Sequence, residues 1–279
     1  MDQKNFFFEL KELSELLSKP EDEKIILCDR LTSVQVLSMC FDKTAEHVVQ
    51  KSNMQTDTEL KLSSYTTDSP EMFIKFPLSV IMGVEKPSAE TEKEKLGISY
   101  FLTEPLEKEM VLEKLEEFIG LYCKRHSIIA DIRLAADELI TNSLFNAPYV
   151  NMENSNSNVE RDNSKISIDP LKKPHIFAGH DQNRVIIGCT DFYGRLNISK
   201  LIERIKLCYI NNPGEMINYE TGGAGIGSYM IFDSCMSYYV AVDPGVTTTL
   251  CCAFPINMSA KERNEVPKNV HIILNQAKP

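Results

Sequence analysis

Three polar residues recur at every fourth position within residues 135–147. Glu138, Asn142 and Asn146 would therefore lie along one face of a helix. The opposite face would pack on a core through Leu139, Ile140, Leu144 and Phe145. One carboxylate and two carboxamides in a row suit a divalent cation and a polarised water, because such cations prefer oxygen ligands. A surface helix with a solvated polar face has the same pattern, so the stripe gains meaning from the motifs that follow it.

A second group with binding chemistry is an acid at the end of a strand. Residues 184–190 read as a buried strand that leads directly into Asp191, and the turn residue Gly194 follows closely. A carboxylate in this place can accept a hydrogen bond from an exocyclic amine such as that of adenine.

Four glycines within six positions form a third motif, and a strand after a turn forms the fourth. The glycines allow the backbone to approach a ligand closely, and the helical run after them would offer unpaired amides to phosphate. They are Gly222, Gly223, Gly225 and Gly227. Further on, Pro244 and Gly245 predict a turn into a β-branched strand that ends at Pro255.

Taken in order, the four motifs resemble those of the GHKL ATPases, the Bergerat-fold family found in gyrase, MutL and the kinase modules of bacterial two-component systems. The resemblance covers about residues 128–256, and the short module is most similar to the anti-sigma-factor serine kinases. It implies ATP and Mg²⁺ as cofactors. It also implies an α/β sandwich whose mixed, largely antiparallel sheet carries helices on one face.

The resemblance gives each matched residue a role. Glu138 matches the glutamate that activates a water or hydroxyl, Asn142 the magnesium-binding asparagine, and Asp191 the aspartate that reads adenine. Thr248 matches the threonine of the final Gly-Thr turn. Gly223, Gly225 and Gly227 match the phosphate loop, with Gly222 as an extra hinge. The other cofactor-binding positions in the matched motifs are Asn146, Gly194, Leu196 and Ile226.

Three departures from the family pattern bear on catalysis. Tyr193 and Arg195 stand where the family has glycines after the aspartate, and Thr247 stands where a glycine precedes the threonine. Residues 197–219 occupy the place of the family's ATP lid. Nucleotide binding is still expected, whereas the geometry of the lid, and with it catalysis, is open.

Composition restricts the class of protein. The net charge is -10, with 40 acidic against 30 basic residues, which argues against non-specific nucleic-acid binding. No stretch approaches 18 apolar residues and the start shows no signal peptide, so a cytoplasmic protein is expected. The eight cysteines are scattered among apolar runs, which favours buried reduced thiols, and the five histidines lack metal-site spacing.

The first half of the chain reads as a smaller α/β unit. Strands are expected at residues 24–29, 77–83 and 98–106, and amphipathic helices at residues 6–18 and 108–122. The strand at residues 98–106 resembles the closing strand of response-regulator receiver domains, but Glu104 replaces the lysine and only Asp29 remains of the acidic pair. Without that lysine an aspartyl phosphate lacks its cation. We expect a degenerate receiver-like domain that binds a partner, or else an unrelated α/β domain.

The predicted organisation is therefore an N-terminal helix (1–21), the receiver-like α/β unit (22–107), a connecting helix (108–127), the ATPase domain (128–258) and a tail (259–279). A polar, mobile insert is expected at residues 150–165. The tail is expected to be peripheral, apart from a possible short strand at residues 270–274.

Two functions fit these observations. One is a bacterial regulatory serine/threonine protein kinase or anti-sigma-like regulator, which would transfer phosphate from ATP to a protein partner of the sigma-factor, anti-anti-sigma or response-regulator type. The alternative is a non-catalytic switch in which ATP alters a protein-binding face. A histidine kinase is less favoured, because neither His47 nor His126 has the context of a phosphoacceptor. A homodimer is possible; no nucleic acid or membrane is expected as a partner.

Overall fold

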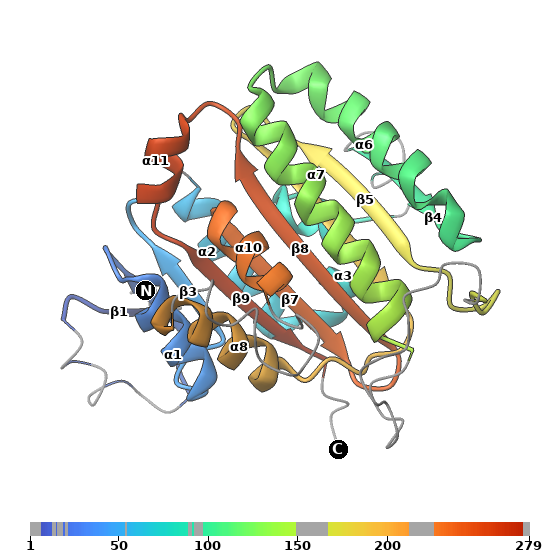
Figure 1. The fold of residues 1–279 in the computed structure, drawn as a ribbon. Helices are drawn as coiled ribbons and strands as arrows, with labels where there is room; N and C mark the ends of the chain where they lie inside the picture. Colours follow the sequence, from blue (N-terminus) through green and yellow to red (C-terminus); the bar gives the residue numbers. More distant parts are fainter. Residues whose placement is uncertain are drawn as a thin grey trace.

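The protein is an α/β structure built on one mixed sheet of nine strands among the described residues (Figure 1). The computed structural model describes residues 7–12, 15, 19, 22–53, 55–88, 91, 97–148, 167–211 and 226–275. The strands are β1 (Phe8–Glu9), β2 (Ile25–Cys28), β3 (His47–Gln50), β4 (Gly97–Phe101), β5 (His175–His180), β6 (Arg184–Asp191), β7 (Ser237–Asp243), β8 (Thr247–Pro255) and β9 (Asn269–Leu274).

Helices lie on both faces of this sheet. They are α1 (Ser33–Phe41), α2 (Thr56–Asp68), α3 (Pro70–Lys75), α4 (Pro77–Ile81), α6 (Lys108–Tyr122), α7 (His126–Thr141), α8 (Ile198–Ile210), α10 (Ile226–Ser234) and α11 (Ala260–Glu265). A 3₁₀ turn, η2 (Pro105–Glu107), precedes α6, and a π-helical turn, η3 (Asn142–Asn146), continues α7.

Strands from the two predicted units are continuous in the sheet, whose order is β1-β2-β3-β9-β7-β8-β6-β5-β4. The strands β1, β2 and β3 are parallel, and β3 then pairs antiparallel with β9, with His47 opposite His271. From β7 to β4 every neighbouring pair is antiparallel. The last strand of the chain therefore lies between the two units. The short strand predicted at residues 270–274 is confirmed as β9, and it lies inside the sheet.

Two further expectations for the first half are wrong. Residues 77–83 form no strand: Pro77 takes the first position of α4, where its missing N–H costs nothing, and Gly83 at φ 71° follows the end of the helix. The strand at residues 98–106 forms over Gly97–Phe101, but it pairs antiparallel with β5 at the far edge from β2 and does not close a parallel unit.

The predicted helix at residues 6–18 is also wrong at its start, because Phe8 and Glu9 form β1, parallel to β2. Residues 13, 14 and 16–18 lie outside the described residues. By contrast, the strand at residues 24–29 is confirmed as β2, and the helix at residues 108–122 is confirmed as α6.

The two faces of the sheet have separate cores because successive strand residues point to opposite sides. On the face toward the viewer in Figure 1, α1, α6, α7, α8 and α10 cover a large cluster that includes Val185 and Ile187. On the other face α2, α3 and α4 cover a smaller cluster that includes Ile186 and Tyr239. All eight residues of β6 are buried as a result. Within residues 128–258, α7, α8 and α10 share one face, as expected, while helices of the first half cover the other.

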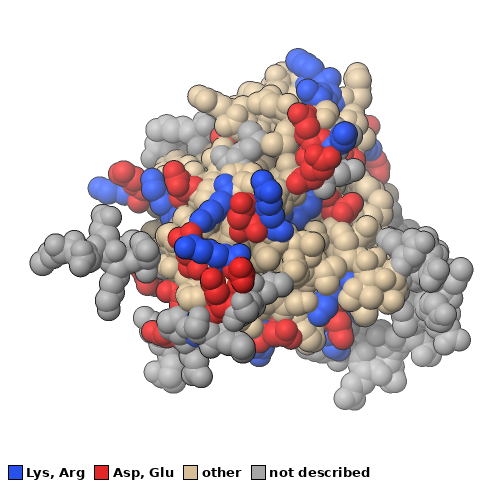
Figure 2. Space-filling model, turned by 90° about the vertical axis from the view of Figure 1, so that its left-hand side faces the viewer, with Lys and Arg blue, Asp and Glu red and all other residues tan. Residues whose placement is uncertain are grey.

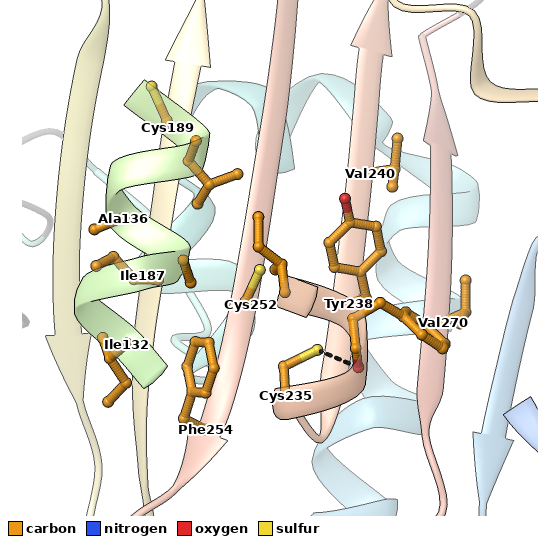
Figure 3. Packing of buried hydrophobic residues seen from close by; sticks show 14 of the residues in the cluster. Ile132, Ala136, Ile187, Cys189, Cys235, Tyr238, Val240, Cys252, Phe254 and Val270 are labelled. Carbon is orange, nitrogen blue, oxygen red and sulfur yellow. Dashed lines mark hydrogen bonds between the residues drawn. The ribbon is translucent and has the colours of Figure 1, made fainter. Parts of the chain in front are cut away.

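All eight cysteines are buried free thiols, as the sequence predicts. Figure 3 shows three of them, Cys189, Cys235 and Cys252, among the apolar side chains of the larger cluster. Within the described part of the chain, no helix is both long and apolar enough to cross a membrane.

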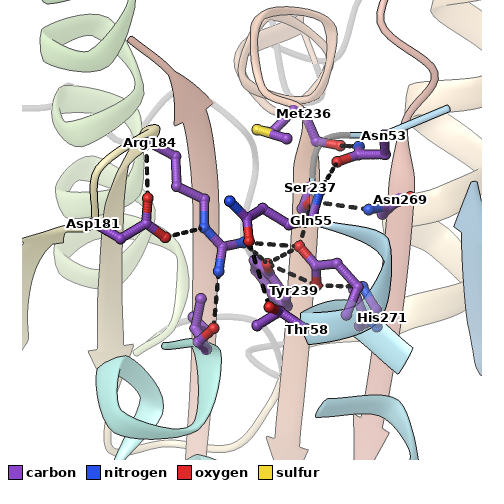
Figure 4. Close-up of polar contacts among 12 residues, drawn as sticks. Asn53, Gln55, Thr58, Asp181, Arg184, Met236, Ser237, Tyr239, Asn269 and His271 are labelled. Carbon is purple, nitrogen blue, oxygen red and sulfur yellow. Dashed lines mark hydrogen bonds and ion pairs between the residues drawn. The ribbon is translucent and has the colours of Figure 1, made fainter. Parts of the chain in front are cut away.

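A buried ionic network fixes the first half of the chain to the sheet (Figure 4). Glu59 on α2 accepts hydrogen bonds from Arg184 (2.9 Å) and Tyr239 (2.8 Å), and it lies 3.1 Å from His271. Burial alone would raise the pKa of Glu59, but the hydrogen bond from His271 and the charge of Arg184 lower it to about 2. The network joins α2 to three strands of the sheet, so the first half and the predicted ATPase segment share a polar as well as an apolar interface.

Candidate nucleotide-binding site

The polar stripe lies at the end of α7, as predicted, with its three side chains joined by hydrogen bonds. The Asn146 amide donates to Oδ1 of Asn142, and the Asn142 amide donates to Oε1 of Glu138 at 3.1 Å. These two hydrogen bonds point the carbonyl oxygen of Asn142 away from Glu138, and among the described residues this oxygen accepts only the hydrogen bond from Asn146. Leu139, Ile140 and Leu144 are buried on the other side, and Phe145 packs against the same core.

The helix changes its winding within this stripe. Over Asn142–Asn146 the backbone forms a π-helical turn, in which the N–H of Ala147 donates to the carbonyl of Asn142 at 3.0 Å. Such turns are rare inside helices and frequently occur at functional sites.

The start of α10 lies directly against the stripe. A β-carbon built on Gly227 would overlap the carboxylate of Glu138. Only glycine therefore fits at this position without moving α10 or Glu138. Ile226, the first residue of α10, is half-buried beside it. The backbone of α10 at this position lies next to the Glu138 carboxylate.

Asp191 closes the site at the end of β6. Its Oδ1 accepts hydrogen bonds from the N–H groups of Tyr193 (2.9 Å) and Gly194 (3.3 Å). Thr248 lies opposite Asp191 in the ladder between β6 and β8. Burial raises the pKa of Asp191, and the two N–H groups and the Thr248 hydroxyl offset this only in part. Besides the Thr248 hydroxyl, no side chain among the described residues donates a hydrogen bond to Asp191, so its carboxylate can accept a further one from a ligand.

Gly194 is required by the turn that it contacts. Its φ is 59°, and its carbonyl accepts a hydrogen bond from the N–H of Gly245 at 3.0 Å. A β-carbon at position 194 would overlap the backbone of Asp243 and Val246. The segment after Asp191 is thereby fixed to the turn between β7 and β8, and Leu196 then packs on the core.

Two contacts bring the end of α7 to the end of β6. Ser143 lies 3.0 Å from the thiol of Cys189, two residues before Asp191. Arg195 donates from its guanidinium to the carbonyl of Pro148 at 2.6 Å. The structure thus assembles the first, second and fourth sequence motifs, together with Gly227 of the third, around one region.

Tyr193 and Arg195, the departures from the family pattern, form part of this region. The Lys172 ammonium lies 4.5 Å from the ring centre of Tyr193, and the Arg195 guanidinium lies 5.5 Å from it. Cations over an aromatic face are attracted by its quadrupole. In place of two flexible glycines, the protein has an aromatic ring with two cations near it.

Other predicted residues fall outside what the structure describes. Gly222, Gly223 and Gly225 lie there, as do residues 212–219 of the expected lid and all of the expected insert at residues 150–165.

The residues present fit a nucleotide with magnesium. Among the described residues no group of three or more His, Cys, Asp or Glu side chains could hold a metal by itself. Magnesium keeps several waters and commonly shares phosphate oxygens with its protein ligand, so one carbonyl such as that of Asn142 is a sufficient anchor. The Asp191 carboxylate suits an exocyclic amine, and the backbone of α10 at Gly227 lies against the Glu138 carboxylate.

Comparisons with known proteins assign no family. No protein-family model matches the chain, and no curated protein searched matches its sequence. The resemblance to the GHKL ATPases therefore rests on the residues and their arrangement alone.

Some members of the site could not be found from spacing. Ser143 lies within the predicted helix but was read only as part of the run, and the bond between Arg195 and Pro148 joins residues 47 positions apart. The only sequence signal for this contact was Arg195 itself, a large cation at a position where the family has a glycine.

Proposed function

We propose that this protein binds ATP and Mg²⁺ between α7, the end of β6 and the start of α10, and that it is a bacterial regulatory ATP-binding protein of the GHKL type. The α/β fold with its mixed sheet is compatible with this proposal. So is the arrangement of residues 128–258, where antiparallel strands carry α7, α8 and α10 on one face.

The observation that carries the proposal is the contact between Gly227 and Glu138. These residues come from the first and third motifs, 89 positions apart in the sequence, and the fold brings them together. The amino-terminal side of a helix favours an anionic ligand, because the positive end of the helix dipole lies there. A carboxylate alone would repel such a ligand, so a cation between the two is required, and Asn142 is placed to hold it.

Each residue has one task in this proposal. Asp191 accepts a hydrogen bond from the adenine amine, Asn142 binds Mg²⁺, and the start of α10 binds phosphate. Bound ATP with Mg²⁺ would supply the phosphoryl group to be transferred. Glu138 would take the proton from a serine or threonine hydroxyl of a regulatory protein partner. The hydrogen bond from Asn142 holds the Glu138 carboxylate in place for this step.

The alternative is a non-catalytic switch, and one observation favours it. The segment after Asp191 is braced by Arg195 on Pro148, by Gly194 on Gly245, and by the cations that flank Tyr193. A braced segment closes over a ligand less readily than two glycines would. In this alternative, ATP binding changes a protein-binding surface without phosphoryl transfer.

Comparison of ATP with GTP tests the base-reading part of the proposal. Equilibrium binding should favour ATP, because the carboxylate of Asp191 attracts the amine of adenine and repels the carbonyl oxygen that guanine has at the same ring position. Equal binding of the two nucleotides would remove Asp191 from its role.

A further inference from the structure

A pocket of about 590 Å³ opens at the junction between the two halves of the chain. Its lining comes from the loop after β2, the start of α1, the ends of α8 and α10, and the segment from α11 to β9. These elements lie at the left of Figure 1, on the side that faces the viewer in Figure 2. None of the proposed nucleotide-binding residues lines it, and its volume is in the range of small-molecule sites.

The pocket lies beyond the carboxyl end of β2, in the parallel part of the sheet. Crevices at the carboxyl ends of parallel strands are common ligand sites. Here Arg30 takes a φ of 56°, which places its backbone in the left-handed region, and α1 begins three residues later. The Arg30 side chain is exposed, and its ion pair with Asp29 is long, at 4.0 Å.

The same pocket is lined by Lys268, whose ammonium group is buried. Lys268 is only 6% exposed, and its Nζ donates to the carbonyls of Asp233 and Cys235, both at 2.7 Å. An ammonium has three N–H donors, and among the described residues it has two acceptors and no carboxylate within ion-pair distance. Burial lowers the pKa of Lys268. The charge of Asp233 offsets this burial only in part, so a carboxylate that enters the pocket would stabilise the buried cation further.

The opposite charge is present on the same walls. Asp233 accepts a hydrogen bond from the Tyr209 hydroxyl at 2.7 Å, and Glu262 caps its own helix. Glu265 has no ion pair within the described ranges. Figure 2 shows acidic and basic side chains interleaved at the centre of this face. A purely anionic ligand would be repelled by the acids, and a purely cationic one by Arg30 and Lys268. A molecule with both charges satisfies both sets.

We propose that this pocket binds a small zwitterion of the α-amino-acid type, with its carboxylate toward Arg30 and Lys268 and its ammonium toward Asp233 and Glu265. Binding here does not depend on the proposed ATP site, and it can be measured without nucleotide.

Isothermal titration of the full chain with each common α-amino acid is the test, with acetate and methylamine as probes of single charge. At least one amino acid should bind at millimolar concentration or tighter, and neither single-charge probe should bind within the same range. Arg30→Gly should weaken binding by about tenfold or more, since it removes a charge-assisted donor. Glu265→Gln should also weaken amino-acid binding, because it removes a negative charge that faces the ligand's ammonium group.

The chain offers a matched control for Arg30→Gly. Lys43 is also an exposed cation at φ 56°, and it does not line the pocket. Glycine accepts this backbone conformation at both positions, so both variants should fold, and Lys43→Gly should bind like the parent. Glu265→Gln keeps the test decisive if Arg30→Gly fails to fold. The proposal is overturned if no amino acid binds, if acetate or methylamine binds as well as the amino acid, or if neither pocket variant changes the affinity.

Discussion

The carboxylate of Glu138 occupies the space that a side chain at position 227 would need. This relationship joins a helix interior to a helix start. It means that a side chain added at position 227 must displace the Glu138 carboxylate. Substitutions at these two positions therefore test the proposed site directly.

Gly227→Ala should destabilise the protein by no more than about 1 kcal/mol, because the added methyl displaces the Glu138 carboxylate, which is the movable end of a flexible side chain. Urea unfolding measures the loss. Truncating the partner in the double variant Gly227→Ala with Glu138→Ala should recover much of it, since the overlap is then gone.

The control for this substitution is Gly120→Ala in α6, where a β-carbon would meet no atom within 4 Å. That variant should gain up to about 1 kcal/mol from helix propensity. If Gly227→Ala raises the free energy of unfolding as Gly120→Ala does, the Glu138 carboxylate does not occupy the space beside Gly227.

Glu138→Gln should remove phosphoryl transfer and leave nucleotide affinity nearly unchanged. Glutamine keeps the size of the side chain beside Gly227 but cannot accept a proton. A general base contributes about 10²–10⁴-fold to rate, so the loss appears in the turnover rate and hardly in binding. Transfer to a partner or to water is measured with labelled ATP. If the variant keeps the parental turnover rate, Glu138 has a structural role only. If the parent protein itself shows no turnover, the non-catalytic switch is favoured.

Asp191→Asn should weaken ATP binding by about 1–3 kcal/mol, because a charged acceptor is replaced by a neutral one. The same substitution should not lower the stability of the fold. The pKa of Asp191 is raised in the folded state, so at a pH between the unfolded and the folded pKa the folded protein binds more protons than the unfolded chain. The charge therefore costs stability at neutral pH, and this cost disappears as the pH falls through the raised folded pKa.

Urea unfolding at neutral pH and ATP titration together test this pair of effects. The asparagine variant should be no less stable than the parent, since its carbonyl still accepts the N–H groups of Tyr193 and Gly194. A less stable variant with unchanged ATP affinity would identify Asp191 as a structural residue.

Glu59→Gln should cost about 3–5 kcal/mol, since it leaves the charge of Arg184 with less compensation in a dry interior. The pKa of Glu59 is lowered from 4.5 to about 2, so its stabilisation is complete above 4.5 and is lost as the pH falls toward 2. Urea unfolding over this pH range should be less pH-dependent in the variant. Glu117→Gln, which removes an exposed pair with Lys114, should change stability by less than about 1 kcal/mol.

The spacing of apolar residues predicted the elements that expose one face to solvent. In α6, Val111, Leu112 and Leu115 are buried while the charged residues between them face solvent, so the pattern gave both its bounds and its orientation. In α4 every residue is buried, from Pro77 to Ile81. A fully buried run has no period, and its apolar composition was read as a strand. Pro77 at the first position and Gly83 after the end were the signals for a helix.

Contacts between residues far apart in the sequence are the part of the site that the sequence could not predict. Glu138, Asn142 and Asn146 share one helix, so their spacing predicts their arrangement. Glu59 and His271 are 212 positions apart, and no local pattern connects them. The same holds for the pocket at Arg30 and Lys268, whose walls come from both ends of the chain.

Isothermal titration of the parent protein with ATP, with Mg²⁺ and then with a chelator, tests the central claim most directly. The proposed site predicts binding that Mg²⁺ strengthens, and it predicts that Asn142→Ala removes this dependence on Mg²⁺ while weak binding of the base remains through Asp191. No binding heat at millimolar ATP, or binding that is the same with the chelator and in Asn142→Ala, would contradict it.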